Sequence, residues 1–309
     1  MKRYSLAIHG GAGTILPSEM DAQKELNYTG ALKEALAGGQ EILASGGSSL
    51  DAVETAVRIL EDCPLFNAGR GSVFNAAGKH EMEASIMDGA TLAAGAVSGI
   101  SLIKNPVSLA RKVKDNSDFV YMSGLGAMDF AREQKVKLMD DAYFFDEYRH
   151  AQWLAVKDSS LARLDHSLLK EKKFGTVGAV AFDSQGNLAA ATSTGGLTNK
   201  KYGRIGDSPI IGAGNYANNA TCAVSCTGYG EYFIRGVVAY DVSALMEYKN
   251  LSLEEASRYV IKEKMVKLGG EGGLIAIDRQ GKISIQFNSE GMYRAWVSAD
   301  DDPVVKIFL

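Results

Sequence analysis

KEKKFGTVGAVAFDSQGNLAAATSTGG, residues 170–196, changes character abruptly at Gly175-Thr176. Upstream, the segment 157–174 is polar, highly charged and weakly periodic, which is typical of a linker. Downstream, TVGAVAFD and NLAAATST are joined by SQG, a pattern that predicts a β-hairpin with glycine in its turn. The Gly-Thr pair is therefore either an ordinary boundary between loop and strand or a point where the chain is cut to expose a threonine.

Strands and helices surround this hairpin in blocks. A second hairpin pattern, GGLIAIDRQGKISIQF at 272–287, again has glycine in its turn. Ser252 and Glu255 have the spacing of a capping box, and Ser49 stands where an N-cap is expected. The remaining expected elements are a strand at 4–9 ending in a glycine loop (HGGAG), helices at 21–45, 49–61, 106–115, 124–135, 141–156, 231–248 and 252–267, a loop at 63–75, and paired strands at 81–88 and 92–103. This order predicts one layered α+β body over residues 1–309.

Composition excludes several classes of protein. The 309 residues carry a net charge of −4, whereas a nucleic-acid partner would leave a basic footprint. No run of about 18 apolar residues predicts a membrane span, and the first residues lack the apolar stretch of a secretory signal. Cys63, Cys222 and Cys226 have no metal-type spacing, so we expect free thiols in a reducing cytoplasm.

Familiar hydrolase motifs are incomplete in this chain. HGGAG resembles the oxyanion loop of some esterases, but the G-x-S-x-G motif that such enzymes need is missing, and GDSPI at 206–210 lacks its final glycine. The histidines do not have the spacing of a zinc site: His9, His80, His150 and His166. We expect His9 to be a structural hydrogen-bonding residue rather than a base.

A threonine at a new N-terminus supplies its own base. Threonine is a poor nucleophile unless a base takes its proton. An α-amino group has a pKa of about 7.7–8, close to the pH at which it must accept that proton. Cutting before Thr176 would thus place nucleophile and base in one residue, and Gly175 leaves the scissile carbonyl uncrowded. The pair alone favours an ordinary strand boundary, so the choice depends on the surrounding sequence.

The blocks FGTVGAVAFDSQGNLAAATSTGGLTNKKYGRIGDSPIIGAG and AVSCTGYGE resemble the plant-type asparaginase/isoaspartyl peptidase family of N-terminal-nucleophile hydrolases. The resemblance extends to IHGGAGTI, CPLFNAGRGSVFN and EMEASIMDG upstream and to GGEGGLIAID and EGMYRAW downstream, so it covers nearly the whole chain in order. It implies a four-layer αββα sandwich that cleaves itself into an α-subunit, 1–175, and a β-subunit, 176–309. It also implies that two such heterodimers associate.

The same resemblance implies catalytic roles. Thr176 resembles the nucleophile, and Thr194 in TSTGG resembles the threonine whose hydroxyl positions and helps activate it. The hydroxyl of Thr227 and the N–H of Gly228 resemble an oxyanion hole, which holds the negative charge of a tetrahedral intermediate. Asn67 resembles a supporting residue near the nucleophile. The alternative for Thr227-Gly228 is a turn after a strand.

The segment GRIGDS supplies two charges that suit an amino acid. Arg204 resembles the clamp for the substrate α-carboxylate, because a guanidinium can bind a carboxylate through two parallel hydrogen bonds. Asp207 resembles the partner of the α-ammonium, and Gly230 resembles a further position that contacts substrate. A cation and an anion three residues apart match a zwitterion independently of the resemblance. The alternative is a surface ion pair in a loop.

The loop LEDCPLFNAGR, residues 60–70, resembles a stabilisation loop whose backbone carbonyls bind sodium. Carbonyl oxygens suit hard cations. The resemblance implies the carbonyls of Leu60, Glu61, Cys63, Phe66, Ala68 and Arg70 as ligands. It implies no cofactor for the chemistry itself.

The sequence therefore predicts an amidohydrolase that cleaves L-asparagine and β-aspartyl dipeptides by acyl transfer to Thr176. Small-molecule substrates and a second copy of the heterodimer are the expected partners, with no nucleic acid and no membrane. Two alternatives stay open. One is a glycosylasparaginase-type amidase, although those enzymes begin with a signal sequence. The other is an uncleaved, non-catalytic relative that binds amino acids through Arg204 and Asp207.

Overall fold

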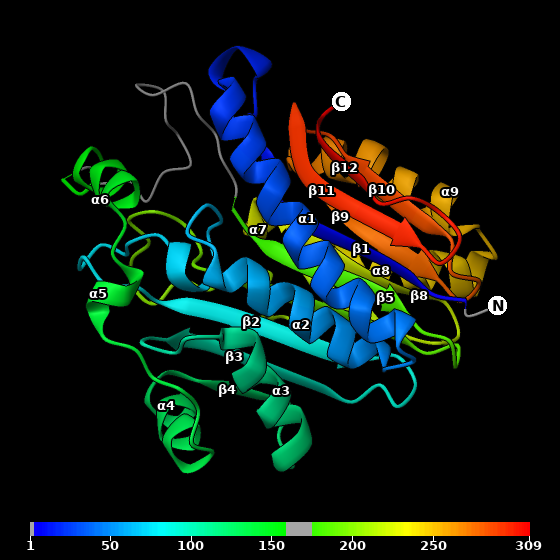
Figure 1. Cartoon of the computed structure of the whole chain (residues 1–309), viewed down its shortest axis with the longest axis horizontal. Helices are drawn as coiled ribbons and strands as arrows, with labels where there is room; N and C mark the ends of the chain where they lie inside the picture. The colour runs from blue at the N-terminus through cyan, green and yellow to red at the C-terminus, as the bar shows by residue number, and fades with distance from the viewer. Residues whose placement is uncertain (1–2, 159–174) are drawn as a thin grey trace.

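Two β-sheets packed face to face form the centre of the molecule, which the computed structural model describes over residues 3–158 and 175–309 (Figure 1). The larger sheet has the strand order β12-β11-β1-β5-β6-β2-β3-β4, and the smaller has the order β10-β9-β8-β7. The strands are β1 (Ser5–Gly13), β2 (Met82–Asp88), β3 (Ala94–Ile100), β4 (Tyr121–Ser123), β5 (Val177–Phe182), β6 (Leu188–Thr194), β7 (Asn215–Ala217), β8 (Cys222–Gly228), β9 (Gly272–Asp278), β10 (Ile283–Phe287), β11 (Gly291–Ser298) and β12 (Val304–Phe308).

Helices cover both outer faces, which gives the four-layer αββα order expected from the sequence (Figure 1). The larger sheet is covered by α1 (Ala22–Ala44), α2 (Ser49–Asp62) and α3 (Pro106–Asn116), and the smaller by α7 (Gly230–Gly236), α8 (Val238–Lys249) and α9 (Leu253–Tyr259). Helix α2 faces the sheet with Val53, Ala56, Val57 and Leu60, the i, i+3, i+4, i+7 spacing of an amphipathic helix. None of the helices in the described ranges is long and apolar enough to cross a membrane.

The alternation of side chains along the central hairpin decides which residues reach the space between the sheets. In β5, one set of side chains packs toward the helices and the other between the sheets: Val177, Ala179 and Ala181 against Val180 and Phe182. Because strand side chains alternate, Thr176 belongs to the set between the sheets. The antiparallel register pairs Val177 with Ser193, so Thr176 comes to lie opposite Thr194.

The structure confirms most of the predicted elements. Both hairpins, the pairing of β2 with β3, and helices α1 to α3 and α4 (Gly124–Glu133) lie close to their expected ranges. The capping box of Ser252 and Glu255 is present at the start of α9. The local signals at these positions agree with the packing, so periodicity and turn chemistry were sufficient to find them.

Three predictions about boundaries are wrong. HGGAG is not a loop: β1 continues to Gly13 through a bulge between His9 and Gly11, where glycine permits a φ of 113°. The N-cap of α2 is Ser48 rather than Ser49, because the Ser48 side chain accepts the Asp51 N–H. The helix expected at 231–248 is broken between α7 and α8 at Val237, whose φ is 48°.

Two other expected helices are divided. The range 141–156 contains α5 (Asp141–Phe144) and α6 (Glu147–Leu154), and 252–267 contains α9, a π-helical turn (Val260–Met265) and α10 (Val266–Leu268). Short 3-10 turns occur at Pro17–Glu19 and Gly69–Gly71. The sequence patterns assigned no strand to β4, β7, β8, β11 or β12. Most of the expected linker, residues 159–174, lies outside the described residues.

The close packing of the two sheets makes Gly178→Ala a test of the fold. A Cβ there would lie 2.0 Å from Ser225 Oγ and 2.4 Å from His9 Nε2, two groups that are hydrogen-bonded to each other. We expect the substitution to lower the free energy of unfolding by about 1–3 kcal/mol, as overpacking does. Urea denaturation measures this. Gly126→Ala, with nothing within 4 Å of its Cβ in α4, is the control and should cost nothing; equal midpoints for the two variants would contradict the prediction.

Candidate active site

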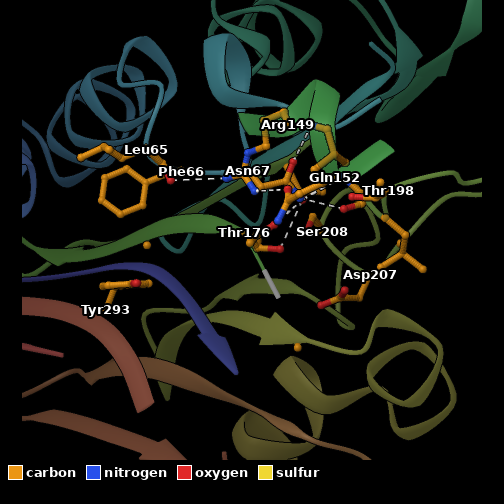
Figure 2. Close-up of a pocket in the computed structure, with 18 of the residues that line it drawn as sticks. Leu65, Phe66, Asn67, Arg149, Gln152, Thr176, Thr198, Asp207, Ser208 and Tyr293 are labelled. Atoms are coloured by element: carbon orange, nitrogen blue, oxygen red, sulfur yellow. Dashed lines mark hydrogen bonds between the residues drawn. The ribbon is translucent and has the colours of Figure 1, made fainter. Parts of the chain in front are cut away.

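A pocket lies beside Thr176, at the end of the central hairpin (Figure 2). Its walls come from the 64–73 loop, from α6, from Gly175 and Thr176 just before β5, from the end of β6, and from the segment 196–208. The structure brings most of the residues singled out from the sequence into this lining: Asn67, Gly175, Thr176, Thr194, Arg204, Asp207 and Gly228. Residues that are far apart in the chain therefore form one site.

The hydroxyls of Thr176 and Thr194 are in contact. The Thr176 Oγ1–H donates to Thr194 Oγ1 over 3.3 Å, and Thr194 Oγ1 donates in turn to the carbonyl of Gly175 over 2.9 Å. Thr194 Oγ1 also accepts the Gly196 N–H at 3.0 Å, so its one proton and both lone pairs are used. Thr194 thus fixes both the hydroxyl of Thr176 and the carbonyl of the bond that precedes it.

His9 holds the main chain of Thr176 and does not contact its hydroxyl. The Nδ1–H donates to the Thr176 carbonyl at 3.1 Å, because a carbonyl can only accept. Nε2 is then unprotonated and accepts from the Ser225 hydroxyl at 2.9 Å, which joins β1 of the larger sheet to β8 of the smaller. Burial lowers the pKa of His9 to about 3, so the imidazole is neutral at pH 7. The structural role predicted for His9 is confirmed.

Asn67 holds the chain that follows Thr194 and lies directly against Gly175. Its Nδ2 donates to the Gly196 carbonyl at 2.7 Å, its Oδ1 accepts the Val73 N–H at 3.0 Å, and its carbonyl accepts the Gly195 N–H at 3.0 Å. A Cβ at position 175 would lie 2.3 Å from Asn67 Cβ. Only glycine therefore fits before Thr176 while the Asn67 contacts are kept.

Arg204 and Asp207 both line the pocket, but Arg204 is paired with a carboxylate, whereas one oxygen of Asp207 has no partner among the described residues. Arg204 Nε and Nη2 donate to the two oxygens of Glu231, both over 2.9 Å, and no described hydrogen bond uses Nη1. Asp207 is buried, and its Oδ2 has no hydrogen-bond partner among the described residues. Burial raises the pKa of Asp207 to about 7, with Glu83 and Glu231 adding to the rise and Arg204 opposing it. An unsatisfied carboxylate beside an arginine suits a ligand that brings an ammonium and a carboxylate.

A buried ion pair lies beneath this loop. Lys200 Nζ donates to Glu83 Oε1 at 3.0 Å and to the Glu81 carbonyl at 2.8 Å, and both charged side chains are buried. The second oxygen of Glu83 accepts the Gly206 N–H at 2.8 Å. Glu83 also pairs with Thr194 across β2 and β6. One carboxylate thus couples the strand that carries Thr194 to the loop that carries Arg204 and Asp207.

The predicted oxyanion residues lie at the end of β8. Gly228 lines the pocket, whereas Thr227 is fully buried and its hydroxyl has no hydrogen-bond partner among the described residues. Gly230 abuts the charged pair: a Cβ there would lie 2.8 Å from Arg204 Nη2 and 2.9 Å from Asp207 Oδ1. Glycine at 230 therefore allows the two charged side chains to come together.

The 60–70 loop gathers backbone carbonyls around two glycines. A Cβ at Gly69 would lie 2.4 Å from the Glu61 oxygen, and one at Gly71 would lie 2.1 Å from the Phe66 oxygen. The carbonyls of Leu60, Phe66 and Ala68 each accept one backbone N–H, which leaves each a second lone pair. Within the described ranges, no group of three or more His, Cys, Asp or Glu side chains is placed to hold a metal. The carbonyl set fits a hard monovalent cation better than a transition metal.

Several residues of this site were not found from the sequence. Glu231 lies in the first turn of a helix, where an acidic residue is common, and its contact with Arg204, 27 residues earlier, appears only in the fold. Glu83 and Lys200 had no signal, because their partnership spans β2 and a loop after β6. Ser225 also had none, since only the packing of the sheets brings it to His9.

Comparisons with known proteins identify relatives over the whole chain. A protein-family model described as asparaginase matches residues 2–307. The isoaspartyl peptidase of Salmonella typhimurium is 53% identical over all of this chain and 99% of its own length. That of Escherichia coli is 53% identical over all of this chain and 97% of its own. A probable isoaspartyl peptidase/L-asparaginase 2 of Arabidopsis thaliana is 43% identical over 97% of each chain.

The unpaired Asp207 predicts that amino-acid binding depends on pH. An ammonium group needs the ionised carboxylate, and the pKa of about 7 means that this form is lost as the pH falls through 7. We expect the affinity for L-aspartate to fall by up to about tenfold per pH unit below 7 and to level off above it. Calorimetric titration between pH 5 and 8.5 measures this. Asp207→Asn should bind weakly at every pH; a wild-type affinity that stays constant from pH 5 to 8 would contradict the prediction.

Proposed function

Because the chain belongs to the asparaginase family, we propose that it releases L-aspartate from β-aspartyl (isoaspartyl) dipeptides and from L-asparagine. The observation that carries this proposal is the contact of Thr176 with Thr194 in a pocket that also holds Arg204 and Asp207. The site offers a hydroxyl nucleophile together with one cation and one anion for an amino acid. The names of the relatives supply the substrates: isoaspartyl peptidase and L-asparaginase.

The enzyme matures by cutting its own chain between Gly175 and Thr176, into an α-subunit (1–175) and a β-subunit (176–309). Thr176 Oγ1 attacks the Gly175 carbonyl carbon, the hydroxyl proton passes to the Thr176 nitrogen, and the C–N bond breaks to leave an ester and a free Thr176 amine. Water then hydrolyses the ester to the Gly175 carboxylate and the Thr176 hydroxyl. The hydrogen bond from Thr194 to the Gly175 carbonyl supports this step, because it stabilises the negative charge that develops on that oxygen.

Turnover repeats this chemistry on the substrate. Arg204 binds the substrate α-carboxylate through its unused Nη1, and Asp207 binds the α-ammonium. Thr176 Oγ1 attacks the side-chain carbonyl, while the new α-amine takes its proton and passes one to the departing ammonia or amino acid. The Gly228 N–H and the Thr227 hydroxyl stabilise the oxyanion; the missing partner of Thr227 supports this role. Water then releases aspartate.

The proposal also covers the association of the chains, their location in the cell and a sodium ion. Two αβ heterodimers associate, giving a native mass of about twice the 33.0 kDa chain. All three cysteines are free thiols, which supports a reducing, cytoplasmic location that cell fractionation can check. The carbonyls of Leu60, Glu61, Cys63, Phe66, Ala68 and Arg70 would hold a sodium ion that stiffens the loop carrying Asn67. That ion has no part in the reaction steps.

Maturation is tested by mass and by activity on the same samples. We expect wild-type protein to give two fragments, the second beginning at Thr176, and to release aspartate from β-aspartyl-leucine and from asparagine. Thr176→Ala should remain one chain and lose activity by more than about a thousandfold, as removal of a nucleophile does, whereas Thr176→Ser should still be cut. Intact and native mass spectrometry with an aspartate assay measures all of this. A permanently intact yet active wild type would overturn the proposal.

Sodium binding is tested by thermal stability at constant ionic strength. Sodium at ten times its Kd should stabilise the folded enzyme by about 1.4 kcal/mol, so the melting temperature should rise as NaCl replaces choline chloride. Gly69→Ala, which puts a Cβ against the Glu61 carbonyl, should lose this dependence, while Gly126→Ala in α4 should keep it. Superimposable melting curves in the two salts would refute sodium binding.

A further inference from the structure

Helix α6 contributes three side chains to the pocket that the chemistry above does not use. Tyr148, Arg149 and Gln152 all line it, and Figure 2 shows Arg149 and Gln152 above Thr176 in that view while Asp207 lies below. The helix precedes the proposed cut, so it belongs to the α-subunit. The pocket thus extends beyond the groups that hold an aspartyl residue.

Within residues 3–158 and 175–309, the contacts of Arg149 leave its charge uncompensated. Its Nη2 donates to the Leu65 carbonyl at 3.4 Å and its Nη1 to Gln152 Oε1 at 3.3 Å, both long bonds to neutral acceptors. The guanidinium carbon lies 5.8 Å from the centre of the Tyr148 ring. No carboxylate of the described residues forms an ion pair with Arg149, in contrast to Arg204, which has both oxygens of Glu231. With five N–H donors, Arg149 retains the capacity to bind an anion.

The charged residues that line the pocket are Arg149, Arg204 and Asp207, which match a substrate with two carboxylates and one ammonium. Arg204 and Asp207 serve the α-carboxylate and α-ammonium of the aspartyl half. The other half of a β-aspartyl dipeptide is an amino acid whose nitrogen is bonded to the scissile carbonyl and whose own carboxylate lies one carbon further on. That second carboxylate has no partner among the groups already assigned, and Arg149 is the cation in the remaining wall.

We propose that Arg149 binds the free α-carboxylate of the leaving amino acid and so makes the enzyme selective for β-aspartyl dipeptides with an unblocked C-terminus. The inference rests on the proposed function. It deepens that function by separating two substrates: asparagine, whose leaving group is ammonia, brings no carboxylate to Arg149. Tyr148 and Gln152 hold the guanidinium from the side of α6, and the Leu65 carbonyl holds it from the 60–70 loop.

The test compares three substrates: β-aspartyl-leucine, its C-terminal amide β-aspartyl-leucinamide, and L-asparagine. A charge-assisted hydrogen bond of the usual strength corresponds to about a ten- to hundredfold effect. We expect wild-type kcat/KM to be higher for the free acid than for the amide by about that factor. In Arg149→Gln this preference should disappear, because the loss on the free acid exceeds any loss on the amide or asparagine by about tenfold or more. Arg149→Lys, which keeps the charge, should retain part of the preference.

Controls separate this role from a structural one. Rates are normalised to the cleaved fraction, and Arg132→Gln, an exposed arginine of α4 paired with Asp129, should match the wild type on all three substrates. Equal losses on the three substrates in Arg149→Gln would overturn the inference, since Arg149 would then only brace Leu65. An unchanged preference for the free acid would also overturn it. Wild-type protein that releases no aspartate from asparagine would instead overturn the proposed function.

Discussion

The hydrogen bond from His9 to the carbonyl of Thr176 is the interaction on which the rest of the site depends. It fixes the peptide that follows the nucleophile, and the other ring nitrogen reaches Ser225 in the second sheet. Ser225 in turn contacts the hydroxyl of Thr192 at 2.7 Å, so three strands of two sheets meet at one network. Burial keeps the imidazole neutral, which lets one nitrogen donate while the other accepts. Gly178 leaves the space that this network occupies.

The register of the β5–β6 hairpin then determines which residues lie beside the nucleophile. Alternation along β5 and the register with β6 put Thr176 and Thr194 in contact. Glu83, which pairs with Thr194 in the sheet, accepts the Gly206 N–H and so fixes the loop of Arg204 and Asp207 relative to Thr194. Leaving one member of a buried ion pair without its partner costs several kcal/mol, so Glu83 and its lysine hold this geometry firmly. Asp207 is different because its free oxygen is buried and unsatisfied. Such a group is tolerated where a ligand completes it.

The sequence predicted the parts of this site that follow from local pattern and missed those that follow from packing. The hairpin was visible in alternation and turn glycine, whereas the roles of Thr176, Thr194, Arg204 and Asp207 were predicted from the resemblance of their motifs to those of the family. The Lys200–Glu83 pair joins residues more than a hundred positions apart, and no local rule connects them. The layered fold was likewise predicted from blocks of strands and helices, while β11 and β12 were not, because their strand character comes from the pairing of β11 with β1 and of β12 with β11.

HGGAG shows the same limit in a different way. Three glycines in five residues are typical of a loop, yet the segment pairs with β11 as far as Gly13. A Cβ at Gly10 would lie 2.3 Å from the Phe66 ring, so at that position glycine serves close packing rather than flexibility. The strand has to continue because it carries His9 to the nucleophile. Glycine content thus indicated an unusual backbone but not its purpose.

The source of the catalytic base follows from what the neighbours of Thr176 cannot do. His9 directs its protonated nitrogen at the carbonyl, its other nitrogen is occupied, and its pKa of about 3 is far too low for it to accept a second proton at pH 7. Thr194 has one proton, and it is donated to the Gly175 carbonyl. On the proposed function, breaking the Gly175-Thr176 peptide bond supplies the base that these neighbours cannot provide. It creates an amine with a pKa of about 7.7–8 on the nucleophile itself, and it turns the Gly175 carbonyl that accepts the Thr194 proton into a carboxylate. One cut therefore separates the reaction that each chain performs once on itself from the reaction that it repeats on its substrate.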